Sequence, residues 1–176
     1  MTITPTSPRL LNLAYLSLGS NVGPEHYLPA AVEKLRCVGE VLRVSRVWQS
    51  PPVGYVHQPD FCNAAVLLEI DLGAAELKRE VIARIESDLD RVRDPRNRSG
   101  PRTVDIDIAL FNEDLISIGG NRIPDPEILI RPFLAVPLAE IDPTYRHPQT
   151  GETLQAVARR LRPHASLHER HDIRLA

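Results

Sequence analysis

Several features are scarce in this sequence, and each shortage excludes a class of protein. The chain has only two cysteines, Cys37 and Cys62, without the paired spacing of a metal site, so we expect both to be buried free thiols. It has no apolar run of membrane-spanning length, and residues 1–10 lack the basic and apolar regions of a signal peptide. These shortages predict a cytoplasmic protein with no membrane partner, in which residues 1–10 form a loose leader.

An excess of positive charge is also missing. The 21 lysines and arginines are outnumbered by 23 aspartates and glutamates, which gives a formal net charge of -2. Nucleic-acid-binding proteins usually present a basic surface, so we expect no nucleic-acid partner, and any basic site must be local. The 176 residues, 43% of them hydrophobic, suffice for one domain with a full core. We expect that domain to span residues 11–162 and residues 163–176 to be a C-terminal tail.

Hydrophobic periodicity predicts four strands and two long helices. The strands cover residues 11–18, 40–48, 61–70 and the segment that ends at Phe111, and the helices cover 24–38 and 73–90. The order strand, helix, strand, strand, helix, strand is typical of an α+β protein with a ferredoxin-like βαββαβ sheet, whose two helices cover one face. The second helix has an apolar stripe at every fourth residue, formed by Leu77, Val81, Ile85 and Leu89.

The remainder of the chain predicts a C-terminal extension. A small hairpin or an irregular excursion falls within residues 112–123, and a short helix covers 153–161. The proline-punctuated segment 124–137 receives no element. The tail holds three histidines at a spacing that a helix could use to bind a metal, namely His164, His168 and His171. We expect a frayed polar terminus there instead.

Two carboxylates interrupt the last predicted strand. Side chains alternate along a strand, so Asp105 and Asp107 project on one face, and the apolar side chains fill the other, namely Val104, Ile106, Ile108 and Leu110. Neighbouring carboxylates repel each other, and Mg²⁺ held with phosphate oxygens would remove the repulsion. A half-exposed strand with its polar side in water gives the same pattern. The guanidinium of Arg102, just upstream, favours a polyphosphate site.

Two long loops lead to the same region. Residues 49–60 contain three prolines and a glycine, and residues 91–99 contain four arginines and run directly into the carboxylate strand. A charged loop is often only a solvated turn, but this one adjoins a candidate metal site. If the helices cover the apolar side of the sheet, Phe61 and Asn63 share the opposite face with the two aspartates.

These motifs together resemble the 6-hydroxymethyl-7,8-dihydropterin pyrophosphokinase family. The most specific match is RSGPRTVDIDI at residues 98–108, which is similar to the family signature around its metal-binding aspartates. Supporting motifs are LGSN at 18–21, SPPVG at 50–54 and QPDFCNAA at 58–65. The resemblance spans roughly residues 14–161, and it implies transfer of diphosphate from ATP to a pterin alcohol in folate biosynthesis.

The resemblance also implies roles for individual residues. Asp105 and Asp107 would hold two Mg²⁺ ions, and with Arg91 and Arg102 they would form the catalytic group. The pterin would contact Ser50, Pro51, Val53, Phe61, Asn63 and Phe133, with the two phenylalanine rings on either side of it. ATP, as co-substrate, would contact Glu86, Arg91, Arg93, Arg98, Arg102, Asp125 and Arg131. Most relatives act as single-domain proteins, so we expect a monomer.

Three positions depart from the family pattern, all on the ATP side. Asp125 replaces a histidine near the phosphates, Ser99 replaces a tryptophan in the arginine loop, and Ala83 replaces a polar nucleotide contact. A carboxylate beside a triphosphate should weaken binding unless a metal or an arginine such as Arg131 offsets its charge. The same reaction with an altered nucleotide site is therefore expected.

Two other interpretations stay open at this level. Nucleotidyltransferase palms also place paired aspartates on a ferredoxin-like sheet, and they release pyrophosphate rather than AMP. A pterin or nucleotide sensor that has lost its activity would fit the three departures. An RNA-binding sheet would expose aromatic side chains where this chain has Asp105 and Asp107, and it fits poorly.

Overall fold

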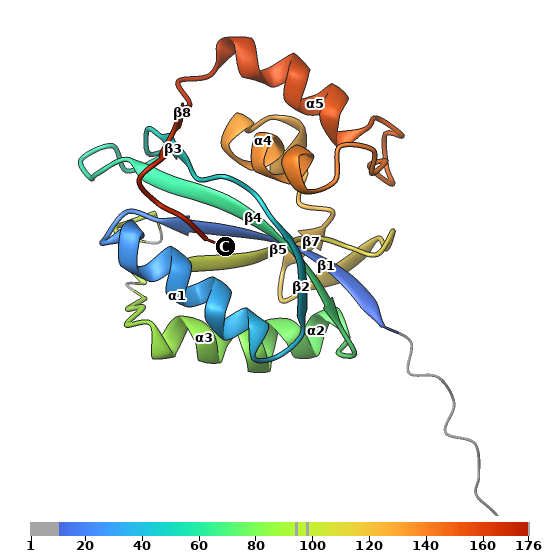
Figure 1. The fold of residues 1–176 in the computed structure, drawn as a ribbon, viewed down its shortest axis with the longest axis horizontal. Helices are drawn as coiled ribbons and strands as arrows, with labels where there is room; N and C mark the ends of the chain where they lie inside the picture. The colour runs from blue at the N-terminus through green and yellow to red at the C-terminus, as the bar shows by residue number, and fades with distance from the viewer. Residues whose placement is uncertain (1–10, 94, 98, 176) are drawn as a thin grey trace, which may run out of the picture.

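The computed structural model describes residues 11–93, 95–97 and 99–175. Its centre is a six-stranded antiparallel sheet (Figure 1), in which strands follow one another in the order β5-β1-β4-β3-β8, and β2 also pairs with β4. The strands are β1 (Asn12–Ser20), β2 (Glu40–Val44), β3 (Trp48–Ser50), β4 (Phe61–Ile70), β5 (Asp105–Phe111) and β8 (His168–Glu169). A separate hairpin joins β6 (Ile116–Ile118) to β7 (Asn121–Ile123), which is one of the two alternatives predicted there.

One face of the sheet is covered by the two predicted helical segments. These are α1 (Pro24–Arg36) and the run of α2 (Ala74–Glu76), η1 (Leu77–Ile82) and α3 (Ala83–Asp88). Pro24 stands at the first turn of α1, where its missing N–H costs nothing. Leu16, Val66 and Ile106 point into the core between this face and the helices.

The opposite face is covered too, which corrects the prediction that helices lie on one side only. Figure 1 shows α4 (Pro132–Ile141) and α5 (Leu154–Leu161) on the side of the sheet away from α1 and α3. Together with η2 (Pro126–Leu129), they pack on Tyr15, Ala65 and Leu67. Sequence analysis left α4 unassigned because of its prolines. Pro132 is tolerated in the first turn, and the cost of Pro137 is offset by burial of the surrounding apolar side chains.

The second helical segment differs from a regular helix. A six-residue π-helix, η1, widens the spacing between inward side chains, so Ile82 is buried and Val81 only partly so. All four residues of the predicted stripe contact the core, with Val81 the least buried of them and Ile82 added. Such π segments are frequent at functional sites.

Three other predictions also need correction. A register shift opposite Tyr15 and Leu16 places Leu110 in the core on the α4 side rather than with Ile106. The strand predicted over 40–48 is divided into β2 and β3. Cys37 is exposed, although Cys62 is buried and both are free.

The C-terminal tail is ordered, not frayed. Its strand β8 pairs with β3, Ile173 and Leu175 are buried in the core on the α1 side, and a short 3-10 turn, η3 (Arg162–His164), precedes it. The predicted short helix is present as α5, capped by the Thr153 side chain, which accepts from Ala156 N at 3.2 Å. The loose leader of residues 1–10 lies outside the described residues. Across the described ranges, no helix has the length and apolar character that a membrane crossing requires.

Candidate active site

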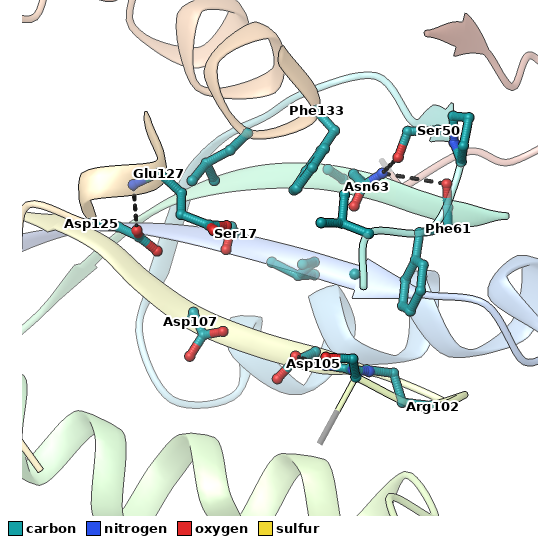
Figure 2. Close-up of a pocket in the computed structure, with 17 residues that line it drawn as sticks. Ser17, Ser50, Phe61, Asn63, Arg102, Asp105, Asp107, Asp125, Glu127 and Phe133 are labelled. Carbon is teal, nitrogen blue, oxygen red and sulfur yellow. Dashed lines mark hydrogen bonds and ion pairs between the residues drawn. The ribbon is translucent and has the colours of Figure 1, made fainter. Parts of the chain in front are cut away.

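A cavity of about 300 Å³ opens beside β1, β4 and β5 on the face that α4 covers (Figure 2). It is lined by side chains from both long loops, the central strands and the start of α4. All six residues predicted to bind pterin line it, namely Ser50, Pro51, Val53, Phe61, Asn63 and Phe133. Arg102, Asp105, Asp107 and Asp125 line the same cavity. The expected meeting of the two carboxylates with Phe61 and Asn63 is therefore confirmed.

The alternation of side chains along β5 determines that both carboxylates face the cavity. Asp105 and Asp107 lie opposite Gly19 and Ser17 of β1, and their side chains project into the cavity in Figure 2. The intervening Ile106 is buried in the core on the other face. The short side chains of Gly19 and Ser17 leave room above the carboxylates.

Two arginines neutralise Asp105. Arg91 Nη1 forms a very short ion pair with Asp105 Oδ1, and Arg102 Nη1 donates to Oδ2 at 2.5 Å. Burial alone would raise the pKa of Asp105, but the two guanidinium groups outweigh it and lower the pKa below its ordinary value. Asp105 is therefore ionised at neutral pH.

Asp107 has a different cationic partner, Lys78 of η1. The Lys78 ammonium donates to Asp107 Oδ1 at 2.5 Å and to the Ile106 carbonyl at 3.2 Å. The Asp107 side chain is 42% exposed, compared with 23% for Asp105. Of the two carboxylates, Asp107 is the more accessible to a ligand in the cavity.

The donor set fits Mg²⁺ bound together with a nucleotide. Mg²⁺ is commonly held by one or two carboxylates, with phosphate oxygens and waters completing its shell. Asp105 and Asp107 supply two hard oxygen ligands on one face. In the part of the chain that the structure describes, no cluster of three or more histidine, cysteine or acidic side chains could hold a metal by itself. Ligands from the substrate would therefore be needed.

The other end of the cavity combines aromatic and amide groups. Asn63 Nδ2 donates to Ser50 Oγ at 3.0 Å and to the Trp48 carbonyl at 3.2 Å, which fixes the orientation of the buried amide. Phe133 enters from α4 and Phe61 from β4 (Figure 2), and the Arg102 guanidinium lies 5.3 Å from the centre of the Phe61 ring. This end suits a flat, uncharged heterocycle that can exchange hydrogen bonds.

The other predicted ATP contacts that the structure describes are not among the residues that line the cavity, namely Glu86, Arg91, Arg93 and Arg131. Glu86 is buried and accepts hydrogen bonds from Arg91 at 3.2 Å, from Arg93 at 2.6 Å and from Ile106 N at 2.9 Å. It connects the arginine loop to β5. Arg131 pairs with Glu127, a cavity residue, at 3.6 Å. Arg98 lies outside the described residues.

The three positions that depart from the family pattern have different surroundings. Asp125 lines the cavity and accepts a hydrogen bond from Glu127 N at 2.8 Å, which caps η2. Burial raises the pKa of Asp125, and the charges of Glu127 and Asp107 raise it further, against the lowering effect of that N–H. Ser99 lines the cavity as well. Ala83 is exposed and lines neither this cavity nor the next one.

A second cavity of about 330 Å³ adjoins the first. Its walls come from η1, β5 and the β6–β7 hairpin, and they include Lys78, Arg122 and Pro126. Asp107 and Asp125 line both cavities. A ligand that occupied both cavities would therefore pass these two carboxylates.

Sequence analysis missed two residues that organise this region. Asn21 is buried and ties the two long loops together, since its Nδ2 donates to Gln58 Oε1 at 2.9 Å and its Oδ1 accepts from Arg102 N at 2.8 Å. Its place in the LGSN motif was the available signal. Lys78 gave no such signal, because one lysine on a helix is ordinarily a solvated side chain.

Comparisons with known proteins agree with this geometry. The sequence model of the family 7,8-dihydro-6-hydroxymethylpterin-pyrophosphokinase (HPPK) matches residues 15–143. A Bacillus subtilis 2-amino-4-hydroxy-6-hydroxymethyldihydropteridine pyrophosphokinase is 42% identical over 133 residues, covering 74% of this chain and 78% of that protein. The Synechocystis protein of the same name is 35% identical over 156 residues, covering 86% of this chain and 78% of that protein.

Solved structures show the same fold. A crystal structure of a Plasmodium falciparum HPPK-DHPS triple mutant superposes with a TM-score of 0.71 at 14% sequence identity, covering 88% of this chain. This chain corresponds to 45% of that longer protein. Because the family model covers most of the chain and the sequence relatives exceed 30% identity, the chain belongs to the 7,8-dihydro-6-hydroxymethylpterin-pyrophosphokinase family.

Proposed function

We propose that this protein transfers diphosphate from ATP to the hydroxymethyl group of 6-hydroxymethyl-7,8-dihydropterin and releases AMP, as a step of folate biosynthesis. The observation that carries the proposal is one cavity in which a carboxylate pair meets two phenylalanine rings and a fixed amide. Charged phosphates and a flat heterocycle need opposite environments, and this cavity offers both. Family membership supports the same reaction.

The reaction is a displacement at phosphorus. The pterin hydroxyl oxygen attacks the β-phosphorus of ATP, the bond between that phosphorus and the α,β-bridging oxygen breaks, and AMP leaves with the bridging oxygen. The hydroxyl proton passes to solvent. Catalysis of such a transfer rests on positioning and on charge stabilisation, so no histidine base is required.

Each charged residue has a specific role in this scheme. Asp105 and Asp107 would hold two Mg²⁺ ions together with the phosphates, and the metal neutralises phosphate charge for in-line transfer. Arg91 and Arg102 hold Asp105 and would supply guanidinium groups to charge that develops on the leaving phosphate. A donor of this kind is commonly worth about 3 kcal/mol. Glu86 positions Arg91 and Arg93 on the nucleotide side of the site.

The pterin would occupy the aromatic end of the first cavity. Phe61 and Phe133 provide apolar surfaces for the ring, and Asn63 provides hydrogen bonds to its edge. No hydrogen bond from a described residue reaches Asn63 Oδ1, so this acceptor is available to a donor on the pterin. Ser50, Pro51 and Val53 complete the wall. ATP would enter from the second cavity, past Asp125. Arg131, which pairs with Glu127 of the first cavity, would contact its phosphates.

Three further statements belong to this proposal. The core strands and α1–α3 form a ferredoxin-like unit, to which β3, β8 and the α4 side are additions. The protein acts as a monomer, which size-exclusion chromatography with light scattering tests. It acts in the cytoplasm, where ATP is available and an exposed thiol such as Cys37 stays reduced.

The decisive experiment is product analysis. Purified protein is incubated with ATP, Mg²⁺ and 6-hydroxymethyl-7,8-dihydropterin, and nucleotides are separated by anion-exchange chromatography. Stoichiometric AMP and a diphosphorylated pterin are expected. Pyrophosphate with nucleotidyl transfer would indicate a nucleotidyltransferase instead, and binding of both substrates without any product would indicate a sensor.

A further inference from the structure

We propose that Lys78 is a phosphate-binding residue of the ATP site that competes with Mg²⁺ for Asp107, so that the lysine couples metal binding to nucleotide binding. This inference rests on the proposed function, which it deepens by one residue. Lys78 belongs to neither the arginine loop nor the carboxylate strand.

The local backbone directs Lys78 toward β5. It lies in η1, whose Leu77 and Ile82 are buried in the core, and the widened turn between them leaves Lys78 facing the sheet. Its ammonium lies 2.5 Å from Asp107 Oδ1 and 3.2 Å from the Ile106 carbonyl oxygen, and the side chain is only 23% exposed. The head group is therefore held beside the carboxylate strand instead of extending into solvent.

The charges of the two cavities indicate which one a triphosphate enters. Among the described residues that line the first cavity, Arg102 is the one cation, against four carboxylates, so this lining disfavours a polyanion that arrives without metal. In the second cavity, Lys78 and Arg122 balance Asp107 and Asp125. Lys78 is the cation of that cavity that also touches a predicted metal ligand. Phosphates that pass from the second cavity toward the pterin come within its reach.

Competition follows from the geometry at one oxygen atom. The Lys78 ammonium lies 2.5 Å from Asp107 Oδ1. A metal ion bound to the same oxygen would be close to this ammonium, and the two positive charges would repel each other. If the metal binds Asp107 Oδ1, the half-buried Lys78 ammonium retains only its hydrogen bond to the Ile106 carbonyl. A phosphate oxygen in the second cavity restores its lost partner. Metal alone should thus bind weakly, and metal with nucleotide should bind well.

This scheme predicts that one variant binds metal alone more tightly and the metal–nucleotide complex more weakly. In Lys78→Met, Mn²⁺ alone should bind about tenfold more tightly, because no ammonium competes, whereas the Mg²⁺ complex of α,β-methylene-ATP should bind about tenfold more weakly. Pterin affinity should not change. Lys78→Arg, which keeps the charge, should recover most of the nucleotide affinity. Isothermal titration calorimetry measures all three ligands.

Lys34 provides a matched control. It is the only other lysine in the sequence, and it forms a 2.9 Å ion pair with Asp88 away from both cavities. Lys34→Met should change none of the three affinities. If Lys78→Met weakened metal and nucleotide binding alike, or left both unchanged, Lys78 would be a structural ion-pair partner and the inference would be wrong.

Amine labelling gives an independent test in the unmodified protein. With two lysines in the chain, the reaction of each with acetic anhydride can be followed by peptide mass spectrometry. Mg²⁺ with α,β-methylene-ATP should slow acetylation of Lys78 at least fivefold relative to Lys34. Equal labelling with and without nucleotide, in protein that releases AMP from ATP, overturns this inference alone. Absence of AMP formation in the wild type would instead overturn the proposed function.

Discussion

Asp107 is one of two side chains that line both cavities. It is the more exposed member of the carboxylate pair, and its neighbour Lys78 comes from a different element. Asp105 is held by two arginines on the same side. The two aspartates are thus unequal, although they are equivalent in the sequence pattern.

Asp107→Asn should abolish turnover and leave the fold intact. The amide keeps the shape of the side chain but loses the charge that a divalent cation needs. AMP release in saturating Mg²⁺ is expected to fall by at least 10²-fold, with an unchanged circular dichroism spectrum. Asp114→Asn, on the exposed turn before β6, is the control and should keep full activity. Near-normal turnover of Asp107→Asn would exclude it as a metal ligand.

Phe133→Ala should impair pterin binding and spare the nucleotide. Removing the ring exposes apolar pterin surface, which costs about 2 kcal/mol and raises the pterin Kd about thirtyfold. Calorimetry with the pterin and, separately, with Mg²⁺ and α,β-methylene-ATP measures both affinities. An unchanged pterin Kd would remove Phe133 from the pocket.

Asp125→Asn tests the substitution that departs most from the family pattern. The amide oxygen can still accept from Glu127 N, so the cap on η2 survives while the charge that we propose to face the phosphates disappears. ATP affinity should increase about threefold to tenfold, measured by calorimetry, because a repulsive charge is removed. Unchanged affinity would mean that the Asp125 charge does not face the phosphates.

The same variant should change how stability depends on pH. The pKa of Asp125 is raised in the folded protein, so folding favours its neutral form. That stabilisation is complete below the unfolded carboxyl pKa of about 3.9 and is lost as the pH rises through the higher folded pKa. Urea unfolding should therefore show a larger gain for Asp125→Asn over the wild type at pH 7 than at pH 4. An equal stability gain at both pH values would contradict a raised pKa for Asp125 in the folded protein.

At the scale of elements, the site depends on the contacts that hold the arginine loop, residues 91–99, against β5. The buried carboxylate of Glu86, in α3, accepts from Arg91, Arg93 and the Ile106 amide at once. Asn21 directly follows β1. Through Arg102 and Gln58, it joins the segment that follows the arginine loop to the proline-rich loop, residues 49–60. These contacts link α3, β1, β5 and both loops, and they bring Arg91 and Arg102 to one carboxylate.

Glu86→Gln should therefore reduce both stability and activity. The amide cannot accept from both arginines, so part of a buried ion-pair network remains uncompensated, at a cost of about 3 kcal/mol. Urea denaturation and AMP release measure the two effects. Glu80→Gln, an exposed residue of η1, should change neither. A fully active, equally stable Glu86→Gln variant would show that the loop is fastened elsewhere.

At the scale of the whole molecule, the C-terminal tail completes the sheet and the core. Its β8 strand pairs with β3, next to the proline-rich loop, and Arg170 donates to Gln49 Oε1 at 3.1 Å. Ile173 and Leu175 add two buried side chains to the core on the α1 side. The tail therefore supports β3, the strand that leads into the proline-rich loop.

A chain that ends at residue 167 should be less stable by about 3 kcal/mol or more. Each of the two lost apolar side chains contributes roughly 1.5–3 kcal/mol when fully buried. The urea midpoint should fall, and pterin affinity should fall with it, because the removed strand pairs with β3. Arg174→Ala in the full chain should leave the midpoint unchanged. A truncated chain with the wild-type midpoint would show that the tail contributes no stability.

The sequence by itself determined the parts of the protein that depend on local periodicity and motifs. The alternation of side chains along β5 places Asp105 and Asp107 on one face whatever covers them. The motifs around Phe61 and Asn63 predict that those residues belong to the same site. The core strands, the β6–β7 hairpin and α5 were predictable for the same reason.

Only the tertiary structure decided the contacts between segments that are distant in the sequence. Helix α4 forms despite its prolines because the sheet buries its apolar side chains, and the tail is ordered because β3 offers a free edge. The π-helix turns Lys78 toward a carboxylate 29 residues away. No local sequence pattern predicts the Lys78–Asp107 ion pair, because the two residues come into contact only when the chain has folded.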